Sequence, residues 1–279
     1  MIFEFGNTRH AAAFFDRNPK FYPAFERLMA LANRCFGRTI YPKNRAEDVC
    51  FDLGHTCRAD YQEILFLAVN GFGTAASKLL RGLYERAVAL AYIVKHPEKA
   101  ERFVRYAAIQ EYKVLNAALT VVTEEQFDQA IILTSAAKIR ELREQVKPEF
   151  QVTLCNKCGN KGMAFSWDID VASMVRAVGD PYDKLYLTSY AIPNLNVHAT
   201  LASVFHDPNP ELQLKRRQED ADRALLDATV ILILAIRCQN VLFGMNLDGE
   251  IETCEADFVD AVNRAVEEHT PSGPCEPKG

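Results

Sequence analysis

The sequence predicts an all-α protein, a multi-helix bundle with one short Cys-x-x-Cys loop insertion. Apolar residues recur three and four positions apart over most of the chain, which is the period of amphipathic helices. No segment of strand length alternates apolar with polar residues, so a fold built on a sheet is not expected. With 279 residues, 49% of them hydrophobic, the chain can bury a core without disulfides or a metal. This composition excludes a disordered chain and a fibrous repeat.

The first half of the chain divides into long helices at its glycines and prolines. The expected helices cover residues 21–36, 46–70, 74–95, 97–122 and 123–146. The third ends at His96 because Pro97 cannot continue the preceding turn, and the same proline suits the first turn of the fourth. The fifth begins with a Thr-Glu-Glu-Gln capping box at Thr123 and ends before Pro148.

The second half is expected to hold one irregular segment followed by further helices. Residues 147–166 have no helical period and contain the Cys-x-x-Cys pair, so we expect an ordered loop or a small knuckle there. Helices are expected over residues 168–178, 181–191, 194–205, 210–244 and 257–268, and a disordered tail over 270–279. We expect an N-terminal helical portion, 1–73, and a helical domain, 74–269.

Charge and composition narrow the partners and the compartment. The formal net charge of −5 argues against a protein that coats nucleic acid, although a local basic patch would still allow such a partner. The longest apolar run, 224–236, is interrupted by Asp227 and is too short to cross a bilayer, so no membrane association is expected. Eight cysteines and no leader-like N-terminus favour reduced thiols in the cytoplasm.

Two blocks of residues carry a recognisable pattern. The first places Arg81 and Glu85 in an apolar helix and continues with Tyr92, Pro97, Glu98, Ala100, Arg102, Phe103, Tyr112 and Lys113. The second runs from Trp167 through the Ala-Val-Gly turn at 177–179 to Tyr182, Tyr186, Ser189 and His198. With these blocks, residues 74–206 resemble DUF5677, a bacterial family of unknown function. The resemblance implies an all-helical bacterial protein and no particular activity. The spacing from Ser189 to His198 is longer than in the family pattern, and the Cys-x-x-Cys loop is an addition to it.

Arg81 and Glu85 are the first candidate site residues. They lie four positions apart and therefore share one side of a helix. Their neighbours are mostly apolar, so each charge has to be paired or solvated, because burying one charge alone costs several kcal/mol. One interpretation is a structural ion pair that fixes the helix register. The other is a polar site in which Arg81 binds an anion or a phosphate and Glu85 orients it.

His198 and Tyr186 are candidates for acid–base chemistry. Tyr182, Tyr186 and Ser189 precede His198 in a polar break between apolar helices. A neutral imidazole beside tyrosine and serine hydroxyls could move a proton near neutral pH. The alternative is a histidine that holds a helix junction through its hydrogen bonds.

Cys155 and Cys158 form a Cys-x-x-Cys pair with the spacing of two ligands to one tetrahedral zinc ion. A structural zinc site needs two further ligands, and the other cluster of cysteine and histidine in the sequence is Cys50, His55 and Cys57. The alternatives for the pair are a redox dithiol or two inert loop cysteines.

Two classes of function remain open from the sequence. The first is an interaction, regulatory or ligand-binding protein of a stress or phage-defence system, with a protein partner or a second copy of itself. The second is a metal-independent ribonuclease resembling the HEPN nucleases, with a composite polar site of Arg81, Glu85 and His198. The literal Arg-x(4–6)-His pattern of those nucleases occurs at Arg264 and His269, close to the chain end and with two acidic residues inside it. The acidic net charge favours the first class, whereas polar residues within apolar helices favour the second.

Overall fold

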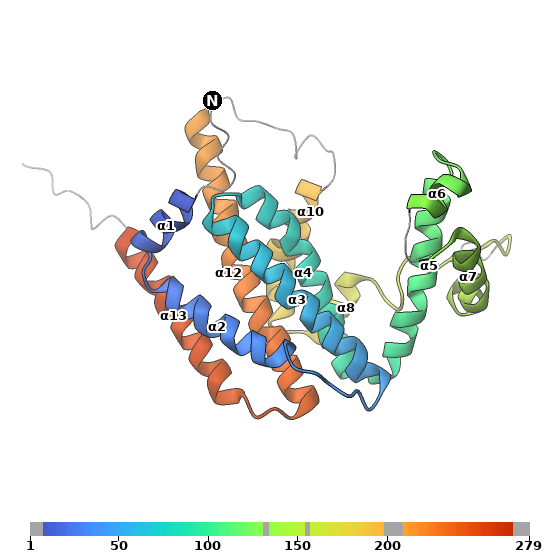
Figure 1. The fold of residues 1–279 in the computed structure, drawn as a ribbon, viewed down its shortest axis with the longest axis horizontal. Helices are drawn as coiled ribbons and strands as arrows, with labels where there is room; N and C mark the ends of the chain where they lie inside the picture. The colour runs from blue at the N-terminus through green and yellow to red at the C-terminus, as the bar shows by residue number, and fades with distance from the viewer. Residues whose placement is uncertain (1–7, 131–133, 154–156, 198–208, 270–279) are drawn as a thin grey trace, which may run out of the picture.

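The computed structural model describes residues 8–130, 134–153, 157–197 and 209–269 (Figure 1). Most of this part of the chain is helical, and its single sheet has two short strands, so the predicted all-α class is confirmed. In chain order the elements are α1 (Thr8–Arg17), α2 (Phe21–Phe36), α3 (Arg45–Val69), α4 (Gly73–Lys95), η1 (Pro97–Lys99), α5 (Ala100–Ala118), α6 (Glu124–Ala130), α7 (Ala136–Phe150), β1 (Gln151–Thr153), β2 (Lys161–Met163), α8 (Val171–Val178), α9 (Tyr182–Tyr186), η2 (Leu187–Ala191), α10 (Ile192–Val197), α12 (Pro210–Phe243) and α13 (Asp248–His269).

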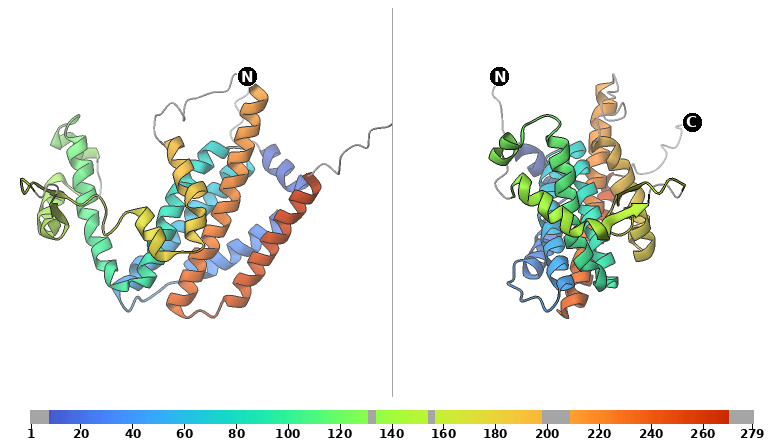
Figure 2. Two further views of the ribbon diagram at one scale, coloured as in Figure 1. Left: turned by 180° about the vertical axis from the view of Figure 1, so that it is seen from behind. Right: turned by 90° about the vertical axis from the view of Figure 1, so that its right-hand side faces the viewer.

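The helices α3, α4 and α12 form the centre of the fold and pack against one another (Figures 1 and 2). Helix α4 is buried around most of its circumference, because α8, η2 and α10 cover the side that α3 and α12 leave open. The apolar run 224–236 lies in α12. Within the described residues, Arg217–Phe243 of α12 is the one stretch long and apolar enough to cross a membrane. In the apolar 18-residue part of this stretch, 56% is buried inside the fold.

The helices α2 and α13 lie side by side and cover one flank of this centre (Figure 1). The Phe258 ring packs between Phe21 and Phe25, with centroid distances of 6.0 and 6.4 Å. Ion pairs of Arg27 with Asp257 and of Arg34 with Glu250 join the exposed edges of the two helices. The same buried cluster takes residues from α2, α3, α4, α8 and α12, so one core extends across the expected boundary at residue 73.

The helices α5, α6 and α7, together with the β1–β2 hairpin, project to one side of the bundle and are called the arm below (Figure 1). The arm has a small buried cluster of its own, made by Leu115, Phe127, Ala136 and Ile139. Its two strands pair antiparallel, with Gln151 opposite Met163. The segment 147–166, expected as an ordered loop or knuckle, therefore contains a short hairpin.

Several helix bounds expected from the sequence are wrong. The single helix expected over 123–146 is divided into α6 and α7, because Ser135 caps a new start by accepting a hydrogen bond from the amide of Lys138. Helix α7 then continues through Pro148 to Phe150, since a proline in the last turn disrupts little of the helix behind it. The last helix starts at Asp248 rather than at 257, where the Asp248 carboxylate accepts a hydrogen bond from Asn240.

Candidate functional site

The expected pair of Arg81 and Glu85 is present on α4, on the side that faces η2 and α10. Arg81 Nη2 donates a hydrogen bond to Glu85 Oε1 over 3.0 Å. The Arg81 side chain is 26% exposed and the Glu85 side chain 36%, so the pair is half-buried and reaches solvent. An i,i+4 pair with this exposure stabilises a helix by only about 0.3–0.5 kcal/mol. Helix stability is therefore a weak reason for these two charges.

The Arg81 guanidinium contacts the outermost ring of a tyrosine cluster that comes from α4, α9 and η2. The guanidinium carbon lies 5.3 Å from the centroid of the Tyr190 ring, within the range of a cation–π contact. The Tyr190 centroid is 5.3 Å from that of Tyr186 and 6.2 Å from that of Tyr84. Tyr186, a predicted site residue, thus belongs to the same cluster as Arg81, one ring further away. Burial raises the pKa of Tyr84 and of Tyr190, so both phenols stay neutral at physiological pH.

Two polar atoms near this cluster are enclosed without a hydrogen-bond partner among the described residues. They are Nε of Arg81 and Oδ1 of Asn194. Asn194 follows Tyr190 by about one helical turn, on α10, which packs against α4. A buried polar atom without a partner costs about 1–3 kcal/mol, so a molecule that offered complementary atoms would lower the free energy of this arrangement.

A second polar contact behind the tyrosines joins η2 to α12 and was missed by sequence reasoning. Ser189 Oγ, which is fully buried, donates a hydrogen bond to Asp227 Oδ2 over 2.8 Å. Burial raises the pKa of Asp227, and hydrogen bonding with Thr188 and Ser189 opposes this rise. The available signal was the acidic residue inside the apolar run 224–236, because a charge in such a helix needs a partner from another element.

Two predicted site residues, His198 and Cys155, lie outside the described residues. Helix α10 ends at Val197, one position before His198. Cys158 is exposed in the connection between β1 and β2. Within the described residues no group of three or more His, Cys, Asp and Glu side chains could hold a metal ion.

The other expected cysteine cluster does not converge on a metal site in the part of the chain that is described. Cys50 and Cys57 share the buried face of α3, whereas His55 is exposed. Burial raises the pKa of Cys50 to about 12, and Cys57 is shifted in the same direction for the same reason. Both thiols therefore stay protonated when no metal is bound, which makes them poor nucleophiles.

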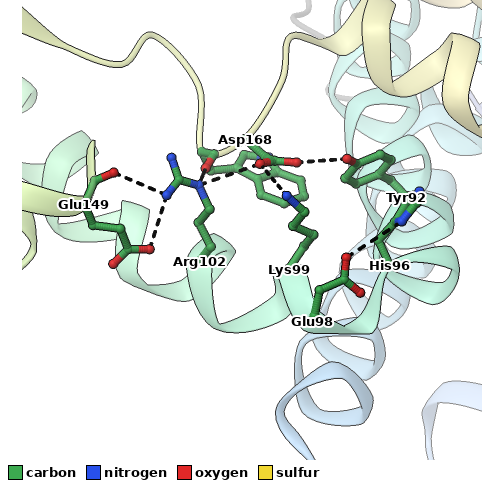
Figure 3. Close-up of polar contacts among 8 residues, drawn as sticks. Tyr92, His96, Glu98, Lys99, Arg102, Glu149 and Asp168 are labelled. Atoms are coloured by element: carbon green, nitrogen blue, oxygen red, sulfur yellow. Dashed lines mark hydrogen bonds and ion pairs between the residues drawn. The ribbon is translucent and has the colours of Figure 1, made fainter. Parts of the chain in front are cut away.

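A separate polar cluster joins the arm to the bundle, and we call it the joint (Figure 3). Asp168, 13% exposed, accepts hydrogen bonds from the Tyr92 hydroxyl over 2.8 Å and from Lys99 Nζ over 3.0 Å. Burial and the Asp168 carboxylate raise the pKa of Tyr92 to about 12, so the phenol remains a donor. Arg102 donates to the Trp167 carbonyl over 2.6 Å and also reaches Glu149 on α7.

The joint explains much of the two-block sequence pattern. The Trp167 ring packs between Tyr92 and Phe103, with centroid distances of 5.7 and 5.1 Å. Tyr92, Arg102 and Phe103 come from the first block and Trp167 from the second. Since every donor and acceptor named here is already paired inside the protein, we interpret this cluster as structural. The Arg81 cluster, which has unpartnered polar atoms, is the better candidate for a site.

Comparison with known proteins gives one match. A family model with the description "Family of unknown function (DUF5677)" matches residues 51–211, which is more than half of the chain. No curated protein and no solved structure matches the chain. The matched range contains both the joint and the tyrosine cluster with Arg81, whereas Asp227 lies beyond its end.

Proposed function

This chain belongs to DUF5677, a family of unknown function, and from its own geometry we propose a ligand-binding, regulatory protein in which Arg81 receives an anionic group. The observation that carries the proposal is the state of the guanidinium. It is half-buried, it lies against the Tyr190 side chain, and its contacts with Glu85 and Tyr190 leave Nε without a partner among the described residues.

The surroundings of Arg81 suit an anion in two further respects. The Tyr190 ring restricts the orientation of the guanidinium, which lowers the entropy lost when a ligand binds. The Nε atom of Arg81 lacks a partner among the described residues but is enclosed, so an anion from solvent would bind through the rest of the partly exposed guanidinium. Glu85 then acts as the orienting group, because it occupies one edge of the guanidinium and leaves the other edges to the ligand.

Titration calorimetry with sodium sulfate at constant ionic strength tests this proposal. Sulfate is a suitable probe because its charge does not change between pH 5 and 8. We expect the wild type to bind sulfate, Arg81→Ala to lose binding, and Lys78→Ala to keep it. Lys78 is the matched control, since it is an exposed cation on the same helix. Glu85→Gln should bind sulfate more tightly than the wild type because it removes a negative charge beside the anion. Equal binding by wild type and Arg81→Ala would contradict the proposal.

The alternative function is a metal-independent ribonuclease in which Arg81 holds a phosphate and His198 moves the proton. What supports it is that α10, which ends one residue before His198, packs against α4, the helix that carries Arg81 and Glu85. Incubation of the protein with single-stranded RNA in EDTA distinguishes the two functions. Cleavage by the wild type that is lost in both Arg81→Ala and His198→Ala would establish the ribonuclease function. RNA that stays intact with the wild type would contradict it and favour the ligand-binding function.

We also propose a structural zinc ion at Cys155 and Cys158. The support is the spacing of the pair and the exposure of Cys158 in the connection between paired strands. Metal content per chain, measured by mass spectrometry on untagged protein, should fall in Cys158→Ser while the helical content is unchanged, since a chain of this length buries its core without a metal. Unchanged metal content in Cys158→Ser would contradict the proposal.

A further inference from the structure

The turn η2 presents the tyrosine on which Arg81 lies, and a carboxylate from another helix holds that turn. Resting on the proposed anion site, we propose that Asp227 is a positioning residue for it. Its carboxylate keeps η2 in register, so that Tyr190 stays against the Arg81 guanidinium and binding at Arg81 depends on the state of Asp227.

The local sequence explains why η2 needs an anchor. It is a π-helical turn in which the Ile192 amide donates to the Leu187 carbonyl, five residues back. Pro193 has no N–H, so the carbonyl of Ser189 has no donor at the position that an α-helix would supply. A π turn is rare and less favourable than an α turn, and it persists where side-chain contacts select it.

Asp227 supplies such a contact from outside the segment. Ser189 lies in the middle of η2 and is fully buried, and its hydroxyl donates to the Asp227 carboxylate over 2.8 Å. Helix α12, which carries Asp227, packs on both η2 and α4. One side chain on α12 therefore fixes the position of η2 relative to the helix that holds Arg81.

The next residue in η2 carries the consequence to the site. Tyr190 follows Ser189, and its ring lies under the Arg81 guanidinium. A change of the turn from π to α register shifts the following residues by one position, which rotates a side chain by about 100° around the helix axis. Without its anchor, η2 would move the Tyr190 ring away from Arg81, and the guanidinium would lose its fixed orientation.

The groups around Asp227 set the direction of the pH dependence. Thr188 and Ser189 contact the carboxylate from η2, and Arg223 is the nearby cation, one turn earlier on α12. Arg81 and Glu85 on α4 lie beyond the tyrosines. Protonation of Asp227 replaces the charge-assisted hydrogen bond from Ser189 with a weaker neutral one, so the anchor weakens as the pH falls. Protonation of Glu85 acts oppositely, because it removes a negative charge beside Arg81. A fall in anion affinity at low pH therefore identifies Asp227.

The first test is independent of any ligand and uses the NMR signal of the Arg81 Nε–H group. This proton is enclosed, so it exchanges slowly, and the adjacent Tyr190 ring shifts its resonance. Asp227→Ala and Ser189→Ala should move the resonance toward its position in Tyr190→Leu. Asp227→Asn, whose amide oxygen can accept from Ser189 only in a neutral hydrogen bond, should move it part of the way. Glu219→Gln, an exposed carboxylate on the same helix, is the control. An unmoved resonance in folded Asp227→Ala and Ser189→Ala would overturn the proposal.

The second test measures sulfate affinity from pH 5 to 8 by calorimetry. In the wild type we expect affinity to fall about tenfold toward pH 5. In Asp227→Asn, the neutral counterpart of the protonated carboxyl, we expect no fall toward pH 5 and an affinity near the wild-type value at pH 5. Asp227→Ala should bind about tenfold more weakly at pH 7. A wild-type profile retained in Asp227→Asn would overturn the inference while leaving the anion site intact. Equal sulfate binding by the wild type and Arg81→Ala would overturn the proposed function. If the Nε–H resonance still moves in Asp227→Ala and Ser189→Ala, Asp227 would nevertheless position Tyr190.

Discussion

Replacement of Gly54 by alanine tests how closely α3 and α12 approach each other. A Cβ atom at Gly54 would lie 2.9 Å from Nε2 of Gln239 and closer than that to Cε1 of Phe36. Neither neighbour can move easily. Phe36 is 2% exposed, and Gln239 is fully buried with its Nε2 donating to the Cys50 carbonyl over 2.7 Å. The added methyl therefore displaces a packed ring and a hydrogen-bonded amide.

Two opposing effects set the size of this change. Alanine gains about 1 kcal/mol over glycine inside a helix, and overpacking a buried site costs about 3 kcal/mol at its upper range. The net loss of about 2 kcal/mol corresponds to a melting temperature lower by about 4 °C for a chain of this size. The control is Gly249→Ala, where a Cβ would meet no atom within 4 Å, and it should raise the melting temperature slightly. Differential scanning calorimetry measures the melting temperatures of both variants and of the wild type. If Gly54→Ala melts at or above the wild-type temperature, the inference that α3 and α12 approach too closely for a Cβ atom at position 54 is refuted.

The remaining predictions concern charged pairs on α4. Arg86 makes two hydrogen bonds to the Asp60 carboxylate, at 2.8 and 3.0 Å, and Asp60 is the more enclosed partner at 12% exposure against 37%. Arg86→Ala should therefore lower the free energy of unfolding by about 2 kcal/mol, less than the loss of about 3–5 kcal/mol expected for a fully enclosed pair. The loss should exceed that of Asp60→Ala, because Arg86→Ala leaves the buried carboxylate without its partner. Denaturant titration of both variants measures the two losses. Burial already raises the pKa of Asp60, and loss of Arg86 raises it further. The difference in unfolding free energy between the wild type and Arg86→Ala should therefore shrink as the pH falls from 7 toward 4. A difference that stays constant with pH would contradict this prediction. Glu85→Ala should cost less than about 0.5 kcal/mol in the same titration, since the pair reaches solvent.

Local patterns predicted most of this fold. The helices over 21–36 and 74–95 agree with α2 and α4 within one residue, because an apolar stripe and a flanking glycine or proline are enough to define a long helix. The start of α13 was missed because a tertiary contact defines it. Asn240, at the end of α12, bonds both the Asp248 side chain and the Leu247 amide. No short-range pattern contains that contact.

The same distinction between local and distant contacts applies to the candidate site. Arg81 and Glu85 are one turn apart on a single helix, so their pairing could be predicted. The contact between Ser189 and Asp227 spans 38 positions and depends on where η2 lies against α12, so sequence reasoning had no means to find it. Asp227 was visible as an interruption of an apolar run, but its partner was not.

The joint has a consequence for how the protein opens. The outer part of the arm carries its own small buried cluster. Its base is held to the bundle by main-core residues such as Tyr106 and Phe150, and also by partly exposed charged contacts of Asp168 with Lys99 and Arg102. Salt weakens such contacts and leaves apolar burial nearly untouched. We therefore expect the backbone amides of α6 and of the first turns of α7 to exchange with deuterium by sub-global opening, at a lower free energy than the amides of α4. Raising the ionic strength should lower the hydrogen-exchange protection of the backbone amides in the arm. It should leave the protection of the amides in the central helices unchanged.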